Sequence, residues 1–303
     1  MRKKLKKVAL CFSGQARTLD LCYPYIKKNI LDSVGERGKD YDIFCCVEED
    51  ANSGKTSILK PAKIKKVKPA DVDRIIKSEI GILRKQNYKT SIFPESFRFN
   101  LQKSYRQMYQ INESFELLKK YIKEKNVSYQ YFIRIRFDFL PLDILKLSDL
   151  KIEKNEVIIP QIKIPHRKDI INDMFCVAKD IDTFESYCSL YNNFRIVVQN
   201  QLSIKPSFVQ KMYFLFEKNY RYVLLNLFDK LNKGKNEIPR YLLGIALLFP
   251  NMFYKEFKSH NKYSIEKALL CHLKSKEIKI KWKNINFVIV RNLTDGLLIF
   301  GKE

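Results

Sequence analysis

Several common signs of a known activity are missing from this sequence. Its seven cysteines include no CxxC pair, and none has a metal-type spacing with the three histidines. These absences argue against a zinc site and a disulfide framework, and they favour the reducing cytosol. The adjacent Cys45 and Cys46 are expected to be small buried residues. Neither a GxGxxG fingerprint nor a Walker A loop is present, which disfavours dinucleotide and P-loop chemistry.

Long apolar runs are also missing. The longest, residues 241–249, falls well short of the ~20 residues that a membrane-spanning helix needs. Residues 8–12 are too short for the core of a signal peptide and are expected to form the first strand. We therefore expect a cytoplasmic protein without a transmembrane helix. Residues 241–254 are expected to form a core helix, and peripheral contact with the cytoplasmic face of a membrane is kept as the alternative.

The formal net charge of +24 requires an anionic partner or another explanation. Nucleic acid, an anionic membrane and anionic small molecules all fit such a charge. No zinc-finger, homeodomain, RRM or KH signature accompanies the lysines, so nucleic acid is not expected as a partner. A non-catalytic basic α/β module that binds nucleic acid or anionic membrane remains the main alternative to an enzyme.

The order of apolar runs predicts an α/β fold with a mainly parallel sheet flanked by helices. Strand-like runs at residues 8–12 and 41–47 enclose a helical pattern, and a long amphipathic helix is expected across residues 101–122. Further strands are expected near residues 64–67, 157–160 and 174–178, and further helices at 71–84 and 183–191. We expect an α/β core in residues 1–200, completed within the same domain by a mainly helical portion in residues 201–303.

Residues 129–141 contain the most informative pattern. They are predicted to form a strand, in which Ile133, Ile135 and Phe137 face one way and Arg134, Arg136 and Asp138 the other. Guanidinium groups suit phosphate oxygens, and a carboxylate can hold the divalent ion that neutralises a diphosphate. The alternative is a solvated face on an edge strand.

The loop after the first predicted strand is a second candidate for anion binding. It contains Ser13, Gly14, Gln15 and Arg17, and it precedes a helix. In an open α/β sheet, ligands bind beyond the carboxyl ends of the strands, where loop amides and helix N-termini meet anions. Gly14 permits close backbone approach, and Arg17 could reach a phosphate or a nucleobase edge. A plain turn is the alternative.

Two acidic residues are candidates for proton transfer. Asp173, preceded by Asn172, lies ahead of a predicted strand, where a carboxylate can take a proton from an attacking hydroxyl. A turn-forming Asn-Asp pair is the alternative. Glu266 opens a predicted helix and could be an ordinary helix-start carboxylate. His260 and His272 have no partner at a ligand spacing and are expected to be structural.

Taken together, these segments resemble GT-A-type glycosyltransferases of the capsule, lipopolysaccharide and surface-glycan kind, which also occur in large DNA viruses. The matching pieces occur in the family's order at residues 9–18, 41–44, 107–111, 131–138, 172–175 and 264–273. The resemblance implies a Rossmann-like sheet, a nucleotide-diphosphate sugar donor, and a surface-glycan or lipid-linked acceptor. A sulfo- or phosphotransferase is a second enzymatic alternative.

The resemblance also suggests roles for individual residues. Asp138 matches the metal-binding acidic motif, so Mn²⁺ or Mg²⁺ is the expected cofactor, although the second acid of DxD is missing from Asp138-Phe139-Leu140. Asp173 is the first candidate for the catalytic base or for acceptor binding, and Glu266 is the second. The expected substrate-binding residues are Ser13, Gly14, Gln15, Arg17, Arg134, Arg136 and Asn172.

Overall fold

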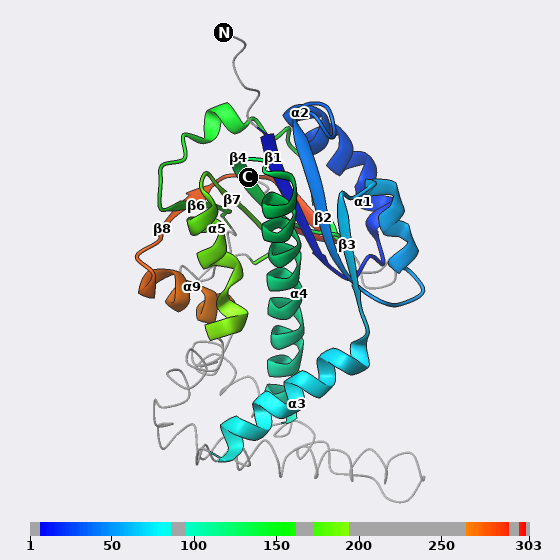
Figure 1. Cartoon of the computed structure of the whole chain (residues 1–303), viewed down its shortest axis with the longest axis vertical. Helices are drawn as coiled ribbons and strands as arrows, with labels where there is room; N and C mark the ends of the chain where they lie inside the picture. The colour runs from blue at the N-terminus through cyan, green and yellow to red at the C-terminus, as the bar shows by residue number, and fades with distance from the viewer. Residues whose placement is uncertain (1–6, 86–94, 162–172, 194–264, 291–296, 301–303) are drawn as a thin grey trace, which may run out of the picture.

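The computed structural model describes residues 7–85, 95–161, 173–193, 265–290 and 297–300. These residues form an α/β fold with a seven-stranded sheet in the order β3-β2-β1-β4-β7-β6-β8 (Figure 1). The strands of this sheet are β1 (Lys7–Gly14), β2 (Tyr41–Glu48), β3 (Lys63–Val67), β4 (Tyr129–Arg136), β6 (Glu156–Pro160), β7 (Phe175–Ala178) and β8 (Lys279–Lys283). Only β7 runs antiparallel to its neighbours, so the predicted mainly parallel sheet is confirmed.

Helices cover both faces of the sheet. One face is covered by α4 (Glu95–Lys125), α5 (Ile181–Cys188) and α9 (Ile265–Ser275). Helix α3 (Pro69–Lys85) packs at the end of the same face. The other face is covered by α1 (Leu19–Ile26), the π-helical turn η1 (Lys27–Leu31), the short α2 (Asp32–Val34) and two 3₁₀ segments, η2 (Ser53–Leu59) and η4 (Leu147–Leu150). Each face therefore has its own apolar core, as expected for a buried parallel sheet.

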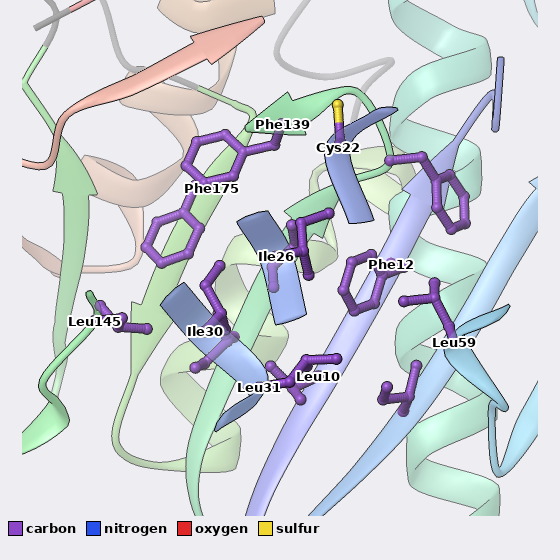
Figure 2. Close-up of a cluster of buried hydrophobic side chains, with 14 of the residues drawn as sticks. Leu10, Phe12, Cys22, Ile26, Ile30, Leu31, Leu59, Phe139, Leu145 and Phe175 are labelled. Atoms are coloured by element: carbon purple, nitrogen blue, oxygen red, sulfur yellow. The ribbon is translucent and has the colours of Figure 1, made fainter. Parts of the chain in front are cut away.

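The alternation of side chains along each strand divides these two cores. In β1, Ala9 and Cys11 pack under α4, whereas Leu10 and Phe12 pack under α1. Figure 2 shows this second core, in which Ile26 of α1 and Ile30 of η1 lie over the strand side chains. On the α4 side, the buried positions Tyr105, Met108, Phe115 and Leu118 recur at helical spacing, which confirms the predicted core-facing helix.

A smaller sheet joins β5 (Phe139–Pro141), β9 (Phe287–Val290) and β10 (Leu297–Phe300) in the order β10-β9-β5. The single strand predicted across residues 129–141 is therefore wrong, because a turn at Phe137-Asp138 divides it between two sheets. The Phe139 ring stacks on Phe175 at 5.1 Å and on Phe287 at 4.8 Å between centroids. These contacts hold β5 in the small sheet and against β7.

The C-terminal portion differs in part from the expectation for residues 201–303. Its described part contains one helix, α9, and three strands that were not predicted. Strand β8 was not predicted because its segment is rich in lysine. It pairs in parallel with β6 and extends the main sheet. Residues 194–264 lie outside the described residues, including the 241–254 stretch and His260, so the mainly helical character stays a prediction there.

Candidate functional site

The candidate site lies where the strand order changes direction. From β1, the chain moves outward to β2 and β3, and β4 then pairs with the opposite edge of β1. In open α/β sheets, ligands bind at such a switch point, outside the carboxyl ends of the strands. Gln15 follows the carboxyl end of β1, Glu48 ends β2, and Asp138 follows β4. These three ends come from distant parts of the sequence and meet at one edge.

The loop after β1 is shaped by Gly14. Its φ of +127° is one that L side chains rarely adopt, and a Cβ built there would meet nothing within 4 Å. Glycine is thus required for its backbone conformation and not for lack of space. Beside it, the buried Ser13 Oγ has no hydrogen-bond partner in the described part of the chain. The loop therefore combines a buried hydroxyl with open space beside the Gly14 backbone at the switch point.

Glu48 is the centre of the first half of the site. Its side chain is almost fully buried, and Gln15 Nε2 donates a hydrogen bond of 3.0 Å to its Oε1. Gln110 Nε2 of α4 lies 3.5 Å from Oε2, and Arg106 Nη1 lies 3.8 Å from Oε1. A buried carboxylate needs such partners, since desolvation of an unpaired charge is costly. Arg106 also pairs with Asp73 of α3, so helices α3 and α4 both position this carboxylate.

Arg136 and Asp138 form the second half of the site. Arg136 donates two parallel hydrogen bonds to the Asp138 carboxylate, from Nε at 2.8 Å and from Nη2 at 2.7 Å. This fork geometry is among the strong forms of charge-assisted hydrogen bond. Burial disfavours the charged guanidinium, but Asp138 and Asp173 outweigh burial and raise the pKa of Arg136. Arg136 is thus a permanent cation beside two carboxylates.

Asp173 connects the two halves. It is 4% exposed and accepts a hydrogen bond from the Gln107 side chain of α4. Gln107 follows Arg106, which faces Glu48, so one turn of α4 contacts carboxylates from both halves. Asp173 also acts electrostatically on Arg136, which holds Asp138. Side chains from β2, α4 and β4, from the segments that follow β1 and β4, and from Asp173 ahead of β7 therefore form one polar cluster.

Arg134 lies deeper, beneath this cluster. It is fully buried, its Nη1 donates to the Met174 carbonyl, and its Nε and Nη2 have no partner among the described residues. Burial lowers its pKa, and the nearby Tyr187 and Asp173 oppose that shift. The alternative of a solvated edge strand is wrong, because β4 is an interior strand of the sheet. The Arg134 guanidinium is 0% exposed, and its hydrogen bond supports the segment before β7; its predicted role in substrate binding stays a prediction.

The remaining predicted residues are placed as follows. Arg17 has an exposed side chain, and its carbonyl oxygen accepts a hydrogen bond of 2.8 Å from Lys55 Nζ. The structure does not bring Arg17 into the cluster. Glu266 is the second residue of α9, but its side chain is not among those described, and Asn172 lies outside the described residues. His272 is buried, with Nε2 3.0 Å from the Ser186 carbonyl oxygen, consistent with the expected structural role.

Four cluster residues were not assigned roles from the sequence: Glu48, Arg106, Gln107 and Gln110. Glu48 follows seven strand residues and resembles an ordinary polar end to a strand. The sequence of α4 does contain a pattern that indicates a polar site. Polar residues recur among the apolar positions of this helix, and several of them are buried, among them Ser104, Gln110 and Ser114. Polar residues within an otherwise apolar helical stripe indicate that the stripe contacts a polar site.

The described residues do not fit a divalent-metal site. Among them there is no group of three or more His, Cys, Asp or Glu side chains that could hold a metal ion. Both oxygens of Asp138, the expected ligand, accept hydrogen bonds from Arg136. Mg²⁺ and Mn²⁺ prefer several oxygen ligands, so this arrangement disagrees with the metal expected from the resemblance.

All seven cysteines are free thiols, and six of them are buried. Cys45 and Cys46 are fully buried, as predicted. Burial raises the pKa of the Cys176 thiol to about 12, with Arg134 opposing the shift. In the described part of the chain, no helix is both long enough and apolar enough to cross a membrane.

Part of the chain matches a known family. Residues 3–182, more than half of the chain, match the family described as Domain of unknown function (DUF7796). The chain belongs to this family. The matched region includes β1 to β7, and with them every residue of the polar cluster described above. No curated protein matches the sequence.

Proposed function

We propose that this DUF7796 member is a GT-A-type glycosyltransferase, which moves a sugar from a nucleotide-diphosphate donor to a surface-glycan or lipid-linked acceptor. One observation carries the proposal. Gln15, Glu48, Asp138 and Asp173, from four separate segments, converge in one polar cluster at the carboxyl edge of the sheet. Polar groups that converge from separate segments at this edge of an α/β sheet are typical of binding and catalytic sites.

The fold supports the same proposal. A GT-A domain is built on a Rossmann-like sheet, and the sheet here is mainly parallel, has helices on both faces and changes direction between β1 and β4. In Rossmann-like sheets, an acid about 20 residues beyond the first βα turn binds the ribose hydroxyls of the nucleotide. Glu48 likewise ends the second strand of this sheet, although the connection from the Gly14 loop is longer here. We assign the nucleoside to the side of the cluster formed by the Gly14 loop and Glu48.

The sugar–diphosphate bond is then assigned to the other side of the cluster. Transfer breaks the bond between the sugar anomeric carbon and the diphosphate oxygen, which keeps the electron pair. A bond forms from that carbon to the acceptor oxygen, whose proton passes to a base. Asp173 is the first candidate for this base, because Gln107 orients its carboxylate. Glu266 remains the second candidate. The growing charge on the diphosphate requires fixed positive groups, and Arg136 is the cation in place.

Acceptor class and location complete the proposal. The glycan or lipid-linked acceptor follows from the resemblance, and the cytoplasmic location follows from cysteine usage, with peripheral membrane contact as part of the proposal. Flotation with anionic liposomes at low salt tests that contact. Absence of binding would remove it without affecting the proposed chemistry.

The function is tested by thermal unfolding with UDP-, GDP-, CMP- and dTDP-sugars, each with manganese and with EDTA. Selective stabilisation by one nucleotide is expected, because a ligand that binds only the folded state raises its stability. Transfer is then measured with that donor. Asp173→Asn should abolish transfer while donor binding survives. Arg37→Gln, at the opposite edge of the sheet before β2, is the matched control and should behave as the wild type.

The non-catalytic basic module is the alternative, and the net charge of +24 favours it. It would present free lysines on an open surface, yet on the edge strand β3 Lys63 pairs with Glu124, and Lys65 pairs with Glu113. Salt-sensitive binding to nucleic acid or anionic vesicles, with no stabilisation by any nucleotide sugar, would favour this alternative and reject the transferase.

A further inference from the structure

In this structure the Asp138 carboxylate is already the partner of a cation. Arg136 engages both of its oxygens, at 2.8 and 2.7 Å. Asp173 also acts electrostatically on Arg136, and Gln107 donates to the Asp173 carboxylate. A divalent ion at Asp138 would share a carboxylate that already accepts two charge-assisted hydrogen bonds, and it would lie beside a guanidinium.

The charges of the cluster lead to the same conclusion. Two guanidinium groups, of Arg134 and Arg136, act electrostatically with two carboxylates, of Asp138 and Asp173. These four side chains balance one another, and all are mostly buried. Adding a divalent cation would leave an excess positive charge in a poorly solvated site, which is unfavourable unless an anion arrives with it.

One edge of Arg136 is available to a ligand. Its Nε and Nη2 are held by Asp138, whereas Nη1 has no hydrogen-bond partner in the described part of the chain, and the side chain is 22% exposed. Asp138 therefore fixes the plane of the guanidinium and leaves two N–H groups for another acceptor. Phosphate oxygens match this donor in charge and geometry.

We infer that the transferase works without a divalent metal ion, and that Arg136, oriented by Asp138, supplies the positive charge to the leaving diphosphate. This inference rests on the proposed function. As the sugar–oxygen bond breaks, the electron pair moves onto the diphosphate oxygen, and the Nη1 hydrogens of Arg136 donate to that diphosphate. Arg136 keeps its own protons, and the acceptor proton goes to the base. In this role Arg136 is a catalytic residue and Asp138 a positioning residue.

The test measures nucleoside diphosphate binding by calorimetry, with UDP, GDP, CDP and dTDP, in EDTA and in manganese. Affinity for the preferred nucleotide should differ by less than about threefold between the two buffers. An affinity at least about tenfold weaker in EDTA, equal to about 1.4 kcal/mol, would overturn the inference and leave the proposed function intact. If neither the diphosphates nor the nucleotide sugars bind in either buffer, the proposed function itself fails.

Two variants separate the role of Arg136 from the role of Asp138. In EDTA, Arg136→Gln should weaken diphosphate binding by about tenfold or more, while Arg37→Gln binds as the wild type. Asp138→Asn should tighten binding in EDTA, because it removes a carboxylate charge that repels the diphosphate. A metal site predicts the opposite, namely loss of manganese-stimulated binding in Asp138→Asn and little effect of Arg136→Gln in manganese. Each variant is first checked by thermal unfolding; if Arg136→Gln does not fold, the wild-type comparison and Asp138→Asn still decide.

Discussion

Charge balance beneath the site makes a sharp prediction about stability. Asp173 acts electrostatically on two guanidinium groups, of Arg134 and Arg136, and Asp138 supplies the second carboxylate. Asp173→Asn leaves two buried cations with one buried anion. Removing one partner of a buried pair costs about 3–5 kcal/mol, because the remaining charge is left uncompensated. We expect a loss of stability of this size.

Arg134→Met should cost much less. It removes one hydrogen bond to the Met174 carbonyl, which still accepts from the Arg136 backbone N–H at 3.1 Å. It also removes two buried nitrogens, Nε and Nη2, that have no partner among the described residues. A single net hydrogen bond contributes about 1 kcal/mol. Asp173 keeps Gln107 and Arg136 as partners, so it is not left alone.

The double variant Asp173→Asn with Arg134→Met restores the balance between Arg136 and Asp138. It should therefore be about 1–3 kcal/mol more stable than the two single effects predict by addition. Urea unfolding followed by circular dichroism measures all four proteins. The exposed pair Asp71 and Arg74, changed in the same way, is the control, and its coupling should stay within about 0.5 kcal/mol. Additive behaviour of the buried pair would refute the proposed charge balance.

The remaining predictions concern single residues. Burial lowers the pKa of His272 below 6.5, so the unfolded state binds the proton more readily. Stability should fall as the pH drops below 6.5, and His272→Gln should flatten this dependence between pH 7 and 5, as measured by urea unfolding. Gly14→Ala should destabilise by about 1 kcal/mol, because φ is +127°, and thermal unfolding checks this. Glu48→Gln should weaken nucleotide binding by about tenfold without loss of fold, as measured by calorimetry with Glu36→Gln, an exposed acid, as control.

The strands and helices of residues 7–193 follow closely from hydrophobic pattern. The runs at 8–12 and 41–47 became β1 and β2, and the helical spacing of residues 101–122 became part of α4. Physical reasons account for this success, since buried parallel strands are nearly continuous apolar runs and helices carry one apolar face. Strand β8 was missed because Lys279, Lys281 and Lys283 alternate with Ile280 and Trp282, and edge strands are commonly rich in lysine.

The site was predicted only in part, because sequence pattern does not specify which side chains meet. Asp138 and Asp173 were named as candidates, and the structure connects them through Arg136. The fork between Arg136 and Asp138 was not foreseen, because strand alternation alone would place both side chains along a row facing the ligand. The turn at residues 137–138 instead brings the carboxylate back onto the guanidinium two residues before it. This local pairing changes Asp138 from an expected metal ligand into a partner of Arg136.

The lengths of α4 and β4 explain why α4 contributes to the site. The same comparison of lengths can be made from the sequence alone. A helix that feeds directly into a strand of a parallel sheet runs antiparallel to that strand, as α4 and β4 do in Figure 1. Arg106 lies nineteen residues before the end of α4 at Lys125, or about 28 Å along the helix at 1.5 Å per residue. From the start of β4 at Tyr129 to Asp138 is about 30 Å at 3.3 Å per residue. The two lengths agree, so Arg106 and Gln107 must lie level with the carboxyl edge, and polar residues at that height of the helix mark the site.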